Sequence, residues 1–307
     1  MTVWTWLALA AAVLVAVIVT AEARRRATGA PGRRFFRHPT AAPGVFVLAF
    51  FVTIALAAPL VAPYPCYLQI DVVHLADQPP SAQFLLGTDP YSRDVWSRLV
   101  CGARISLGVG TVAMLVAVTL GAVVGGVAGY FRRWADTALM RVVDVGLAIP
   151  RIFVLLVVVA LWDRVSLPVL VFLIGVTGWF GTSRLVRAEV LSLREREFVG
   201  AARALGAGSA RVIFRHVLPN AAAPIIVSAA LGIGNVMLLE AGLSFLGLGV
   251  ASPTASWGNM IYDSWHKITV SPWASLFPGL AISVVVMALN ATGDALRDAL
   301  DPRKEGA

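Results

Sequence analysis

Three ionisable residues stand out because they lie in or beside long apolar stretches of the chain. Asp144 and Arg151 interrupt the apolar run Val142–Trp162, and Glu240 follows the uncharged run Val217–Leu239. Ionisable groups at membrane depth are costly, face protein or water rather than lipid, and often mark ion or proton pathways. Pairing within a helix bundle, or a position near the lipid headgroups, explains them equally well. None of the three forms a series with another along one helix, so we do not predict a proton relay.

The usual motifs of catalytic, metal and nucleotide sites do not occur in the sequence. It contains no G-x-x-x-x-G-K-[ST] loop that could hold nucleotide phosphates. The fragments Gly206-Ala207-Gly208 and Gly247-Leu248-Gly249 lack the third glycine of a dinucleotide-binding loop, so we interpret both as turns. H-E-x-x-H and G-x-S-x-G are absent, and the four histidines do not have the spacing of metal ligands. We therefore predict no catalytic residue, no metal site and no cofactor bound by this chain.

The stretch Leu191–Asn220 has two apolar helical faces separated by glycines. The first face is predicted to contain Phe198, Ala201, Ala202 and Leu205. Gly206 and Gly208 supply a turn that residues with a Cβ atom resist. Ser209 can then cap a second short helix. That helix carries on one side Val212, Ile213, His216 and Val217.

A projecting helix, turn and second helix suit docking into a groove on another protein. The alternative, a solvated linker between membrane spans, explains the arginines of this stretch but not its two apolar faces. We therefore predict that the stretch binds a partner.

Residues 63–102 form a second polar segment, repeatedly broken by proline. At about 40 residues the segment is too long for a simple turn, so we expect it to lie outside the membrane and to dock a partner. Its second half, Leu85–Leu99, carries apolar residues at helical spacing and is predicted to lie on the membrane surface.

The elements that must position these residues are membrane helices. Hydrophobic residues make up 58% of the 307 residues and charged residues only 14%, whereas soluble domains carry about 25% charge. A membrane helix needs about 20 apolar residues, and seven runs come close to or exceed that length. These are Met1–Ala21, Pro39–Ile70, Ile105–Phe131, Val142–Trp162, Val165–Ser183, Val217–Leu239 and Ile268–Gly293. The runs are continuously apolar rather than alternating, which favours helices over barrel strands. We predict an all-α, polytopic membrane helix bundle.

Smaller signals refine this bundle. Gly121, Gly125 and Gly129 have the spacing that lets two helices approach closely in lipid, or they serve merely as small apolar residues. Pro150 is expected to kink its helix. Positive charge follows the run Val3–Thr20 instead of preceding it, which favours an extra membrane helix over a signal peptide or a spurious extension. We interpret Gly29–Gly32 as a short flexible joint.

The basic residues predict the orientation of the spans. The net charge is +8, and most of the 25 Lys and Arg residues fall in four segments that alternate spans place on one side. These segments are residues 21–40, 132–141, 184–215 and 297–304. The positive-inside rule predicts that this side, including the C-terminus, is cytoplasmic, and it makes nucleic-acid binding the weaker explanation of the charge. Cys66 and Cys101 then both lie outside, where a disulfide can persist. We favour free thiols, because Cys101 begins a span.

Within the stretch described above, Ala201-Ala202, Gly206 and Leu218-Pro219 resemble the signature of the permease subunits of binding-protein-dependent ABC importers. The spacing of that signature is kept in full, with Gly200 where Glu is usual and His216 where Ile is usual. The resemblance implies that Gly200, Ala201, Ala202, Arg203, Gly206, His216, Leu218 and Pro219 belong to a loop that couples to the ATPase.

Further motifs are similar to the C-type subunit of dipeptide and oligopeptide permeases. Leu86-Gly87-Thr88-Asp89, Arg93-Asp94 and Ser97-Arg98 resemble an external motif of that family, with Ser92 in place of Gly. The resemblance implies that these eight residues face the binding protein. Leu243–Gly249 followed by Ser256-Trp257-Gly258, and the C-terminal stretch Gly293–Pro302, fit the same family. The resemblance covers residues 33–303 and leaves out Val3–Thr20.

The family implies a complex in the bacterial cytoplasmic membrane. Its members would be this chain, a related second permease subunit, two ATPases that use ATP and Mg²⁺, and an extracellular substrate-binding protein, with no nucleic acid. Dipeptides, oligopeptides, nickel chelates or other peptide-like solutes fit this architecture. We divide the chain into residues 1–40 (extra helix and basic linker), 41–102 (first core helix and external loop) and 103–302 (type-1 permease core with the loop 191–219).

Two other classes of protein are less consistent with the sequence. An ion-coupled secondary transporter would require midplane charges and internal repeats, and a membrane-embedded hydrolase would require paired carboxylates or a nucleophile motif. The sequence has isolated charges, no convincing repeat and no such motif.

Overall fold

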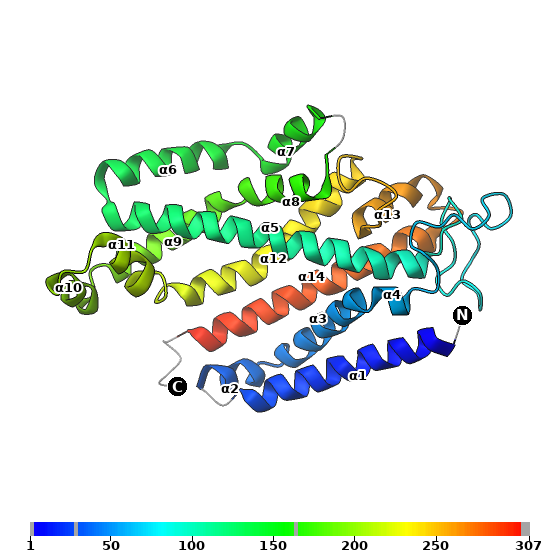
Figure 1. Ribbon diagram of the computed structural model, residues 1–307, viewed down its shortest axis with the longest axis horizontal. Coiled ribbons are helices and arrows are strands. Elements are labelled where there is room, and N and C mark those ends of the chain that lie inside the picture. The colour runs from blue at the N-terminus through cyan, green and yellow to red at the C-terminus, as the bar shows by residue number, and fades with distance from the viewer. Residues whose placement is uncertain (1–2, 28–29, 163–164, 302–307) are drawn as a thin grey trace.

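Apolar helices lying side by side form the whole framework (Figure 1). The structure, a computed structural model, describes residues 3–27, 30–162 and 165–301, and no β-strand forms in these ranges. The helices are α1 (Val3–Arg26), α2 (Ala30–Arg37), α3 (Ala41–Leu56), α4 (Ala58–Val61), α5 (Val95–Phe131), α6 (Arg133–Ala148), α7 (Arg151–Ala160), α8 (Leu167–Val176), α9 (Trp179–Leu193), α10 (Glu197–Ala204), α11 (Ser209–Arg211), the π-helical turn η1 (Val212–Val217), α12 (Ala222–Phe245), α13 (Trp257–Ser264), the 3₁₀ turn η2 (Trp265–Lys267) and α14 (Pro272–Leu300). The predicted helical class is confirmed.

Four segments of the described chain are long and apolar enough to cross a membrane by themselves: α5, α8 with α9, α12 and α14. Two bent pairs bring the number to six, namely α2 with α3, bent by 92°, and α6 with α7, bent by 80°. The predicted kink at Pro150 is therefore a full break, since α6 ends at Ala148 and α7 begins at Arg151. Helix α1 adds a further helix of 24 residues beside α3.

Two local predictions were wrong. We predicted a flexible joint at Gly29–Gly32, but residues 30–32 are helical and begin α2. Gly29 lies outside the described residues. Pro31 fits the first turn of a helix, where its missing N–H costs nothing. The segment Leu85–Leu99 does not lie flat either. Its last residues, from Val95, are the first turns of α5.

Glycine brings α5 and α9 into direct backbone contact. A Cβ atom on Gly121 would lie 2.6 Å from Thr182 Cβ, and one on Gly129 would lie 2.9 Å from Val190 Cβ. Gly125 sits between them, where a Cβ would meet Val186 Cβ at 2.9 Å. The three glycines thus form the close helix contact that their spacing predicted.

Helix α1 packs on the outside of this framework. Its Ala12 is buried in an apolar cluster with Ile54, Ala58 and Val61 of α3 and α4 and with Val100 of α5. Small residues on α1 allow it to lie close to α3, and its other face is apolar and exposed. The extra helix is therefore a packed part of the described bundle.

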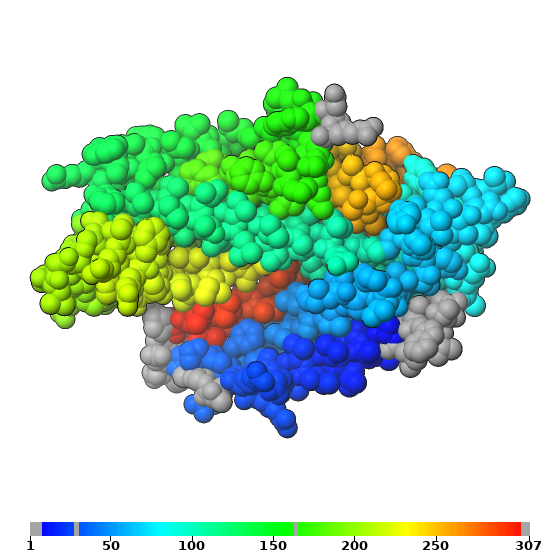
Figure 2. Space-filling model, in the orientation of Figure 1, coloured from blue at the N-terminus to red at the C-terminus, as the bar shows by residue number. Residues whose placement is uncertain are grey.

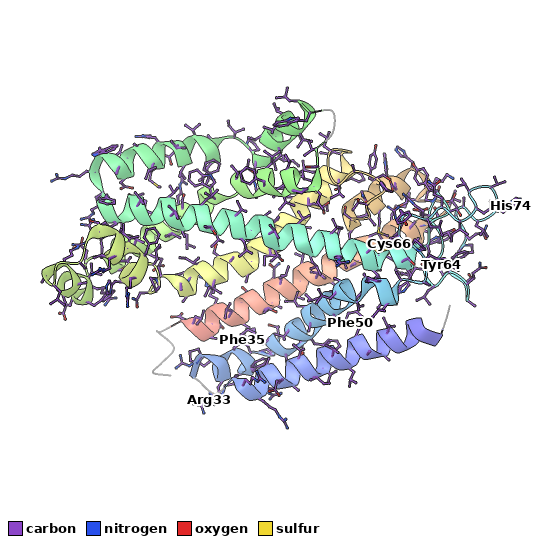
Figure 3. All side chains as sticks on the ribbon, viewed as in Figure 1. Arg33, Phe35, Phe50, Tyr64, Cys66 and His74 are labelled. Atoms are coloured by element: carbon purple, nitrogen blue, oxygen red, sulfur yellow. A yellow bond between two sulfur atoms is a disulfide. The ribbon has the colours of Figure 1, made fainter. Side chains whose placement is uncertain are left out.

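The two ends of the bundle differ. One end, here called the loop end, carries the irregular residues 62–94; the other, the lobe end, carries residues 194–219 (Figures 1 and 2). In Figure 3 the labels Cys66, Tyr64 and His74 mark the loop end, whereas Arg33 and Phe35 lie toward the opposite end.

We predict that Gly125→Ala destabilises the protein because its methyl group forces α5 and α9 apart. Overpacking a well-packed contact costs about 1–3 kcal/mol, so the midpoint of thermal unfolding in detergent should fall by several degrees. Gly108→Ala is the control, since a Cβ there meets nothing within 4 Å. Equal unfolding temperatures for the two variants would contradict the assigned contact.

Candidate functional site

The polar motif at the loop end folds into a buried network. Arg93 is only 3% exposed and Arg98 only 1%. The Arg93 Nε donates to Asp89 Oδ2 at 2.6 Å, and its Nη2 donates to Asp263 Oδ2 of α13, also at 2.6 Å. The Arg98 Nη2 donates to the same Asp263 oxygen at 3.1 Å. Two guanidinium groups and two carboxylates therefore join the loop, the start of α5 and α13.

The remaining motif residues hold the loop in shape. Thr88 Oγ1 donates to the Leu75 carbonyl at 2.6 Å, and the Trp273 indole donates to the Thr88 carbonyl at 3.0 Å. Gly87 has φ +76°, and a Cβ there would lie 2.6 Å from Trp273 Nε1, so only glycine fits. Leu86 is half-buried and packs on the adjacent apolar cluster.

Asp94 starts α5. Its Oδ2 accepts the Ser97 N–H at 2.8 Å and the Ser97 hydroxyl at 2.6 Å, which caps the helix. Burial raises the pKa of the Asp94 carboxyl, and the hydrogen bonds from Ser97 oppose that rise.

The eight predicted motif residues thus come together, but their side chains face the interior of this chain. The prediction that they face a binding protein was wrong for the side chains themselves. Exposed docking loops and buried ion networks can both alternate charged and small residues. The motif also gave no sign of the distant carboxylate, Asp263, that completes the network.

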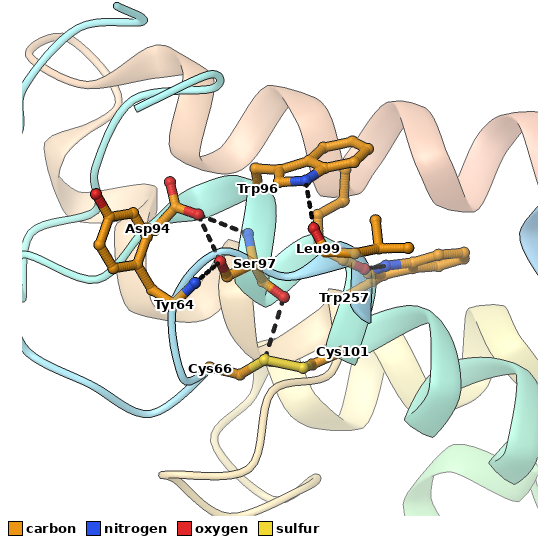
Figure 4. Close-up of a disulfide and its surroundings, with 9 residues drawn as sticks. Tyr64, Cys66, Asp94, Trp96, Ser97, Leu99, Cys101 and Trp257 are labelled. Atoms are coloured by element: carbon orange, nitrogen blue, oxygen red, sulfur yellow. Dashed lines mark hydrogen bonds between the residues drawn. A yellow bond between two sulfur atoms is a disulfide. The ribbon is translucent and has the colours of Figure 1, made fainter. Parts of the chain in front are cut away.

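A disulfide fastens the loop to α5, contrary to the favoured free thiols (Figure 4). Cys66 and Cys101 have Cα atoms 6.4 Å apart and are separated by 35 residues in sequence. The neighbouring Tyr64 N–H donates to Ser97 Oγ at 3.1 Å. Cys101 does lie within α5, as expected, but on the turn that faces the returning loop.

Several apolar side chains are exposed on the loop. Tyr67 and Val73 are 66% and 84% exposed, and Leu68 and Val72 are also exposed. Beside them the His74 ring nitrogen lies 3.0 Å from Asp71 Oδ2, and this hydrogen bond holds the pKa of the Asp71 carboxyl below its usual range. These exposed side chains were not predicted from the sequence, and they can contact a partner.

The two predicted intramembrane acids are both bonded within the chain. Glu240 is 1% exposed, and its Oε1 accepts the hydroxyls of Ser244 at 2.7 Å and Ser256 at 3.0 Å. Ser256 also caps α13, so Glu240 ties α12 to the start of that helix. Asp144 pairs with Arg184 of α9. Pairing within the bundle therefore accounts for both acids.

The lobe end is a small packed unit on the ends of α5 and α9. Val199 and Ala202 of α10, with Val212 and Val217 of η1, are buried in one cluster with Tyr130 of α5. Gly206 has φ +80° and forms the turn between the two helical pieces, as predicted. The predicted cap Ser209 is instead the first residue of α11, and Gly208 precedes it without a side-chain cap.

The first apolar face of the lobe is divided between interior and surface. Ala202 points inward, whereas Phe198, Ala201 and Leu205 are exposed, Leu205 by 88%. Phe214 of η1 is exposed by 54%. The expectation that Ala202 itself lies against a partner was wrong, because the residue fills this chain's own lobe.

The other predicted loop residues surround this surface. Gly200 and Pro219 are exposed, while His216 and Leu218 are half-buried. The Arg203 guanidinium covers the Tyr130 ring, 5.0 Å from its centroid, which fastens α10 to α5.

A groove of about 1200 Å³ runs between α5, α7, α9, α12 and α14. Its floor is formed mainly by small and apolar residues, including Ala117, Gly178, Ala223 and Gly232. Polar side chains also line it, and they are Arg151, Thr182, Glu189, Arg196, Asn220, Ser228, Asn235, Arg297 and Asp301. Of the predicted C-terminal motif, Arg297 and Asp301 thus reach the groove, and Pro302 lies outside the described residues.

Two family models match this chain. Residues 117–306 match the model described as binding-protein-dependent transport system inner membrane component, and residues 32–80 match the N-terminal TM domain of oligopeptide transport permease C. Helix α1 precedes both ranges.

Named relatives cover most of the chain. The dipeptide transport system permease protein DppC of Alkalihalophilus pseudofirmus is 43% identical over 260 residues, which are 85% of this chain and 84% of that protein. The oligopeptide transport system permease protein OppC of Mycobacterium tuberculosis is 39% identical over 272 residues, which are 88% of this chain and 92% of that protein.

We predict that Asp263→Asn strongly destabilises the loop end, because it leaves two buried guanidinium groups with Asp89 as their only described carboxylate. Removing one partner of a buried ion network costs about 3–5 kcal/mol. Thermal unfolding of the purified protein measures the effect. The control, Asp71→Asn, removes an exposed carboxylate and should change the unfolding temperature little; equal losses in both variants would refute a special role of the network.

Proposed function

The chain belongs to the family of inner-membrane components of binding-protein-dependent transport systems, the permease subunits of ABC importers, and we propose that its cargo is dipeptides or oligopeptides. The groove carries this proposal. It has the volume for a short peptide, and its amide and hydroxyl groups can hydrogen-bond a peptide backbone. The relatives DppC and OppC, a dipeptide and an oligopeptide permease by name, support the same substrate class.

The groove would be one half of the translocation path. A second, related permease subunit would close its open side, so that peptide moves along the interface between the two subunits. Movement of the helices around the groove would alternate its access between the two sides of the membrane, as a coupling between two states.

The lobe would be the part of this chain that receives the driving force. Its exposed Phe198, Leu205 and Phe214 form an apolar surface at the end of the bundle, which suits a groove on an ATPase subunit. Because the lobe packs directly on Tyr130 of α5 and Val190 of α9, a displacement of the lobe would also displace these two helices at their glycine contact. This chain would hydrolyse nothing itself, and its two partner ATPases would use ATP and Mg²⁺.

The loop end would face outward from the bacterial cytoplasmic membrane, and the lobe and C-terminus would face the cytoplasm. The distribution of Lys and Arg supports this orientation. The disulfide supports it too, since such bonds persist in oxidising compartments. The substrate-binding protein would then dock on the exposed side chains Tyr67, Leu68, Val72 and Val73.

We predict that a membrane-impermeant maleimide labels Val73→Cys in intact spheroplasts. Val73 is 84% exposed at the loop end. Arg133→Cys, exposed at the start of α6 on the lobe end, should be labelled only after the membrane is permeabilised. The native Cys66 and Cys101 are joined to each other and should not react. The reverse pattern of labelling would overturn the orientation.

We also predict that Leu205→Glu uncouples transport. A carboxylate buried in an apolar interface is unfavourable, and each 1.4 kcal/mol changes binding tenfold, so uptake of labelled trialanine should fall about tenfold or more. Uptake and ATP hydrolysis are measured side by side in vesicles that contain the complete complex. The lobe should remain folded, since Leu205 is 88% exposed.

The control is Ser192→Glu, which adds the same charge at an exposed position on α9. Normal uptake by Leu205→Glu, with the ATPases bound, would show that the lobe is only a linker. A complex that hydrolyses ATP but takes up no peptide of any length would refute the substrate class.

A further inference from the structure

Arg151 is placed differently from the other arginines of the bundle. It begins α7 directly after the 80° break. Its Nε donates to Thr177 Oγ1 at 3.1 Å, and its Nη2 donates to the Ile174 carbonyl at the end of α8. These two bonds fix the guanidinium beside Gly178, where a Cβ would lie only 2.8 Å from Nη2.

The depth of Arg151 follows from its neighbours on the groove. Gly178 packs against Ala117 of α5, and all three residues line the groove. Ala117 lies 14 residues from the lobe end of α5 at Phe131, which is about 21 Å at 1.5 Å per residue. In a hydrocarbon core about 30 Å thick and centred on this 37-residue helix, the guanidinium would lie inside the membrane, where it reaches the groove.

Arg151 also lacks a counter-ion in the described chain. No carboxylate of residues 3–27, 30–162 or 165–301 forms an ion pair with it. By contrast, Arg184 pairs with Asp144 and Arg187 pairs with Asp136. The groove's own acids, Glu189 and Asp301, lie toward the lobe end, at the ends of α9 and α14. A cation at membrane depth without a counter-ion attracts an anion that enters the groove.

Helix α12 supplies complementary groups along the same groove. Asn235 lies in the middle of this apolar helix and is exposed, and Ser228 lies two turns away on the same lining face. Neither side chain has a hydrogen-bond partner among the described residues. An amide directed into lipid would be unfavourable, so this face suits a polar ligand with hydrogen-bonding groups along its length.

We propose that Arg151 binds the C-terminal carboxylate of the peptide within the groove, while Asn235 and Ser228 of α12 bond its backbone. The inference rests on the proposed peptide substrate. Two guanidinium nitrogens are held by α8, and Nη1 has no partner among the described residues, so it can donate to a carboxylate oxygen. Arg151 is thus a residue that selects peptides with a free C-terminus during translocation, in addition to any selection by the binding protein.

The test compares ATP-driven uptake of trialanine and of its C-terminal amide by the complete complex in vesicles. For each complex, the rate for trialanine is divided by the rate for its amide. The measured quantity is this ratio in the wild-type complex divided by the same ratio in the Arg151→Gln complex. The binding protein is identical in both complexes, so its own preference cancels. A charge-assisted hydrogen bond is strong enough that this double ratio should be about ten.

A charge control and a second substrate sharpen the test. Arg297→Gln removes the same charge at the groove's lobe end and should change both rates alike. Alanyl-glutamyl-alanine amide carries its only carboxylate on a side chain. If the wild-type complex prefers this peptide to trialanine amide as strongly as it prefers trialanine, Arg151 recognises side-chain carboxylates and the C-terminal assignment is overturned. A double ratio near one also overturns it, as expected if Arg151 only fastens α7 to α8.

A measurement on the unmodified protein covers the case in which Arg151→Gln does not assemble. A tripeptide with a photoactivatable C-terminal residue should cross-link near Gly178, and cross-links confined to the groove's lobe end would overturn the proposal. Absence of all peptide uptake by the wild-type complex would instead refute the proposed function itself. Arg151→Lys, which keeps the charge, should retain part of the preference.

Discussion

The rest of the structure depends on the backbone contact between α5 and α9. Three glycines on α5 lie against Thr182, Val186 and Val190, where no Cβ would fit without displacement. In lipid, where burial of apolar surface does not drive helices together, close packing of this kind is a main source of association. The lobe sits on the ends of these two helices, and the groove opens beside them. A change in their separation would therefore move both regions together.

Some charges of the described bundle hold its helices together, whereas Arg151 has no counter-ion among the described residues. Near the loop end, Arg93 and Arg98 share Asp89 and Asp263; along α9, arginines pair with acids of α6. Such pairs are satisfied before any ligand arrives, and they fix the positions of their helices. Arg151 is held by an amide carbonyl and a hydroxyl instead, which orients its guanidinium but leaves its charge uncompensated within the described chain.

The sequence predicted the helical class, the glycine contact, a bend at Pro150 and the turn at Gly206, because each follows from local backbone chemistry or from residue spacing along one helix. It did not predict which polar residues are buried. Arg93 and Arg98 are buried because Asp263, 165 residues beyond Arg98, meets them, and a pattern within one segment carries no information about such a partner. The lobe shows the same limit. Phe198 and Ala202 belong to one apolar stretch, yet one is exposed and the other is buried, since Tyr130 and η1 decide which side is covered. The groove has no sequence signal of its own, because five helices contribute to it.

The bond between Cys66 and Cys101 has a consequence for how the protein is made. Thiols in the bacterial cytoplasm are kept reduced, so on the proposed topology the bond can close only after residues 62–101 have crossed the membrane. Closure restricts a loop of 35 residues, which in the chain-entropy model is worth about 4 kcal/mol. The outward surface would thus mature last, after insertion of the helices. In a production host whose extracytoplasmic space does not oxidise thiols, the bundle would insert with its outer loop unfastened, and the membrane yield would not report this defect.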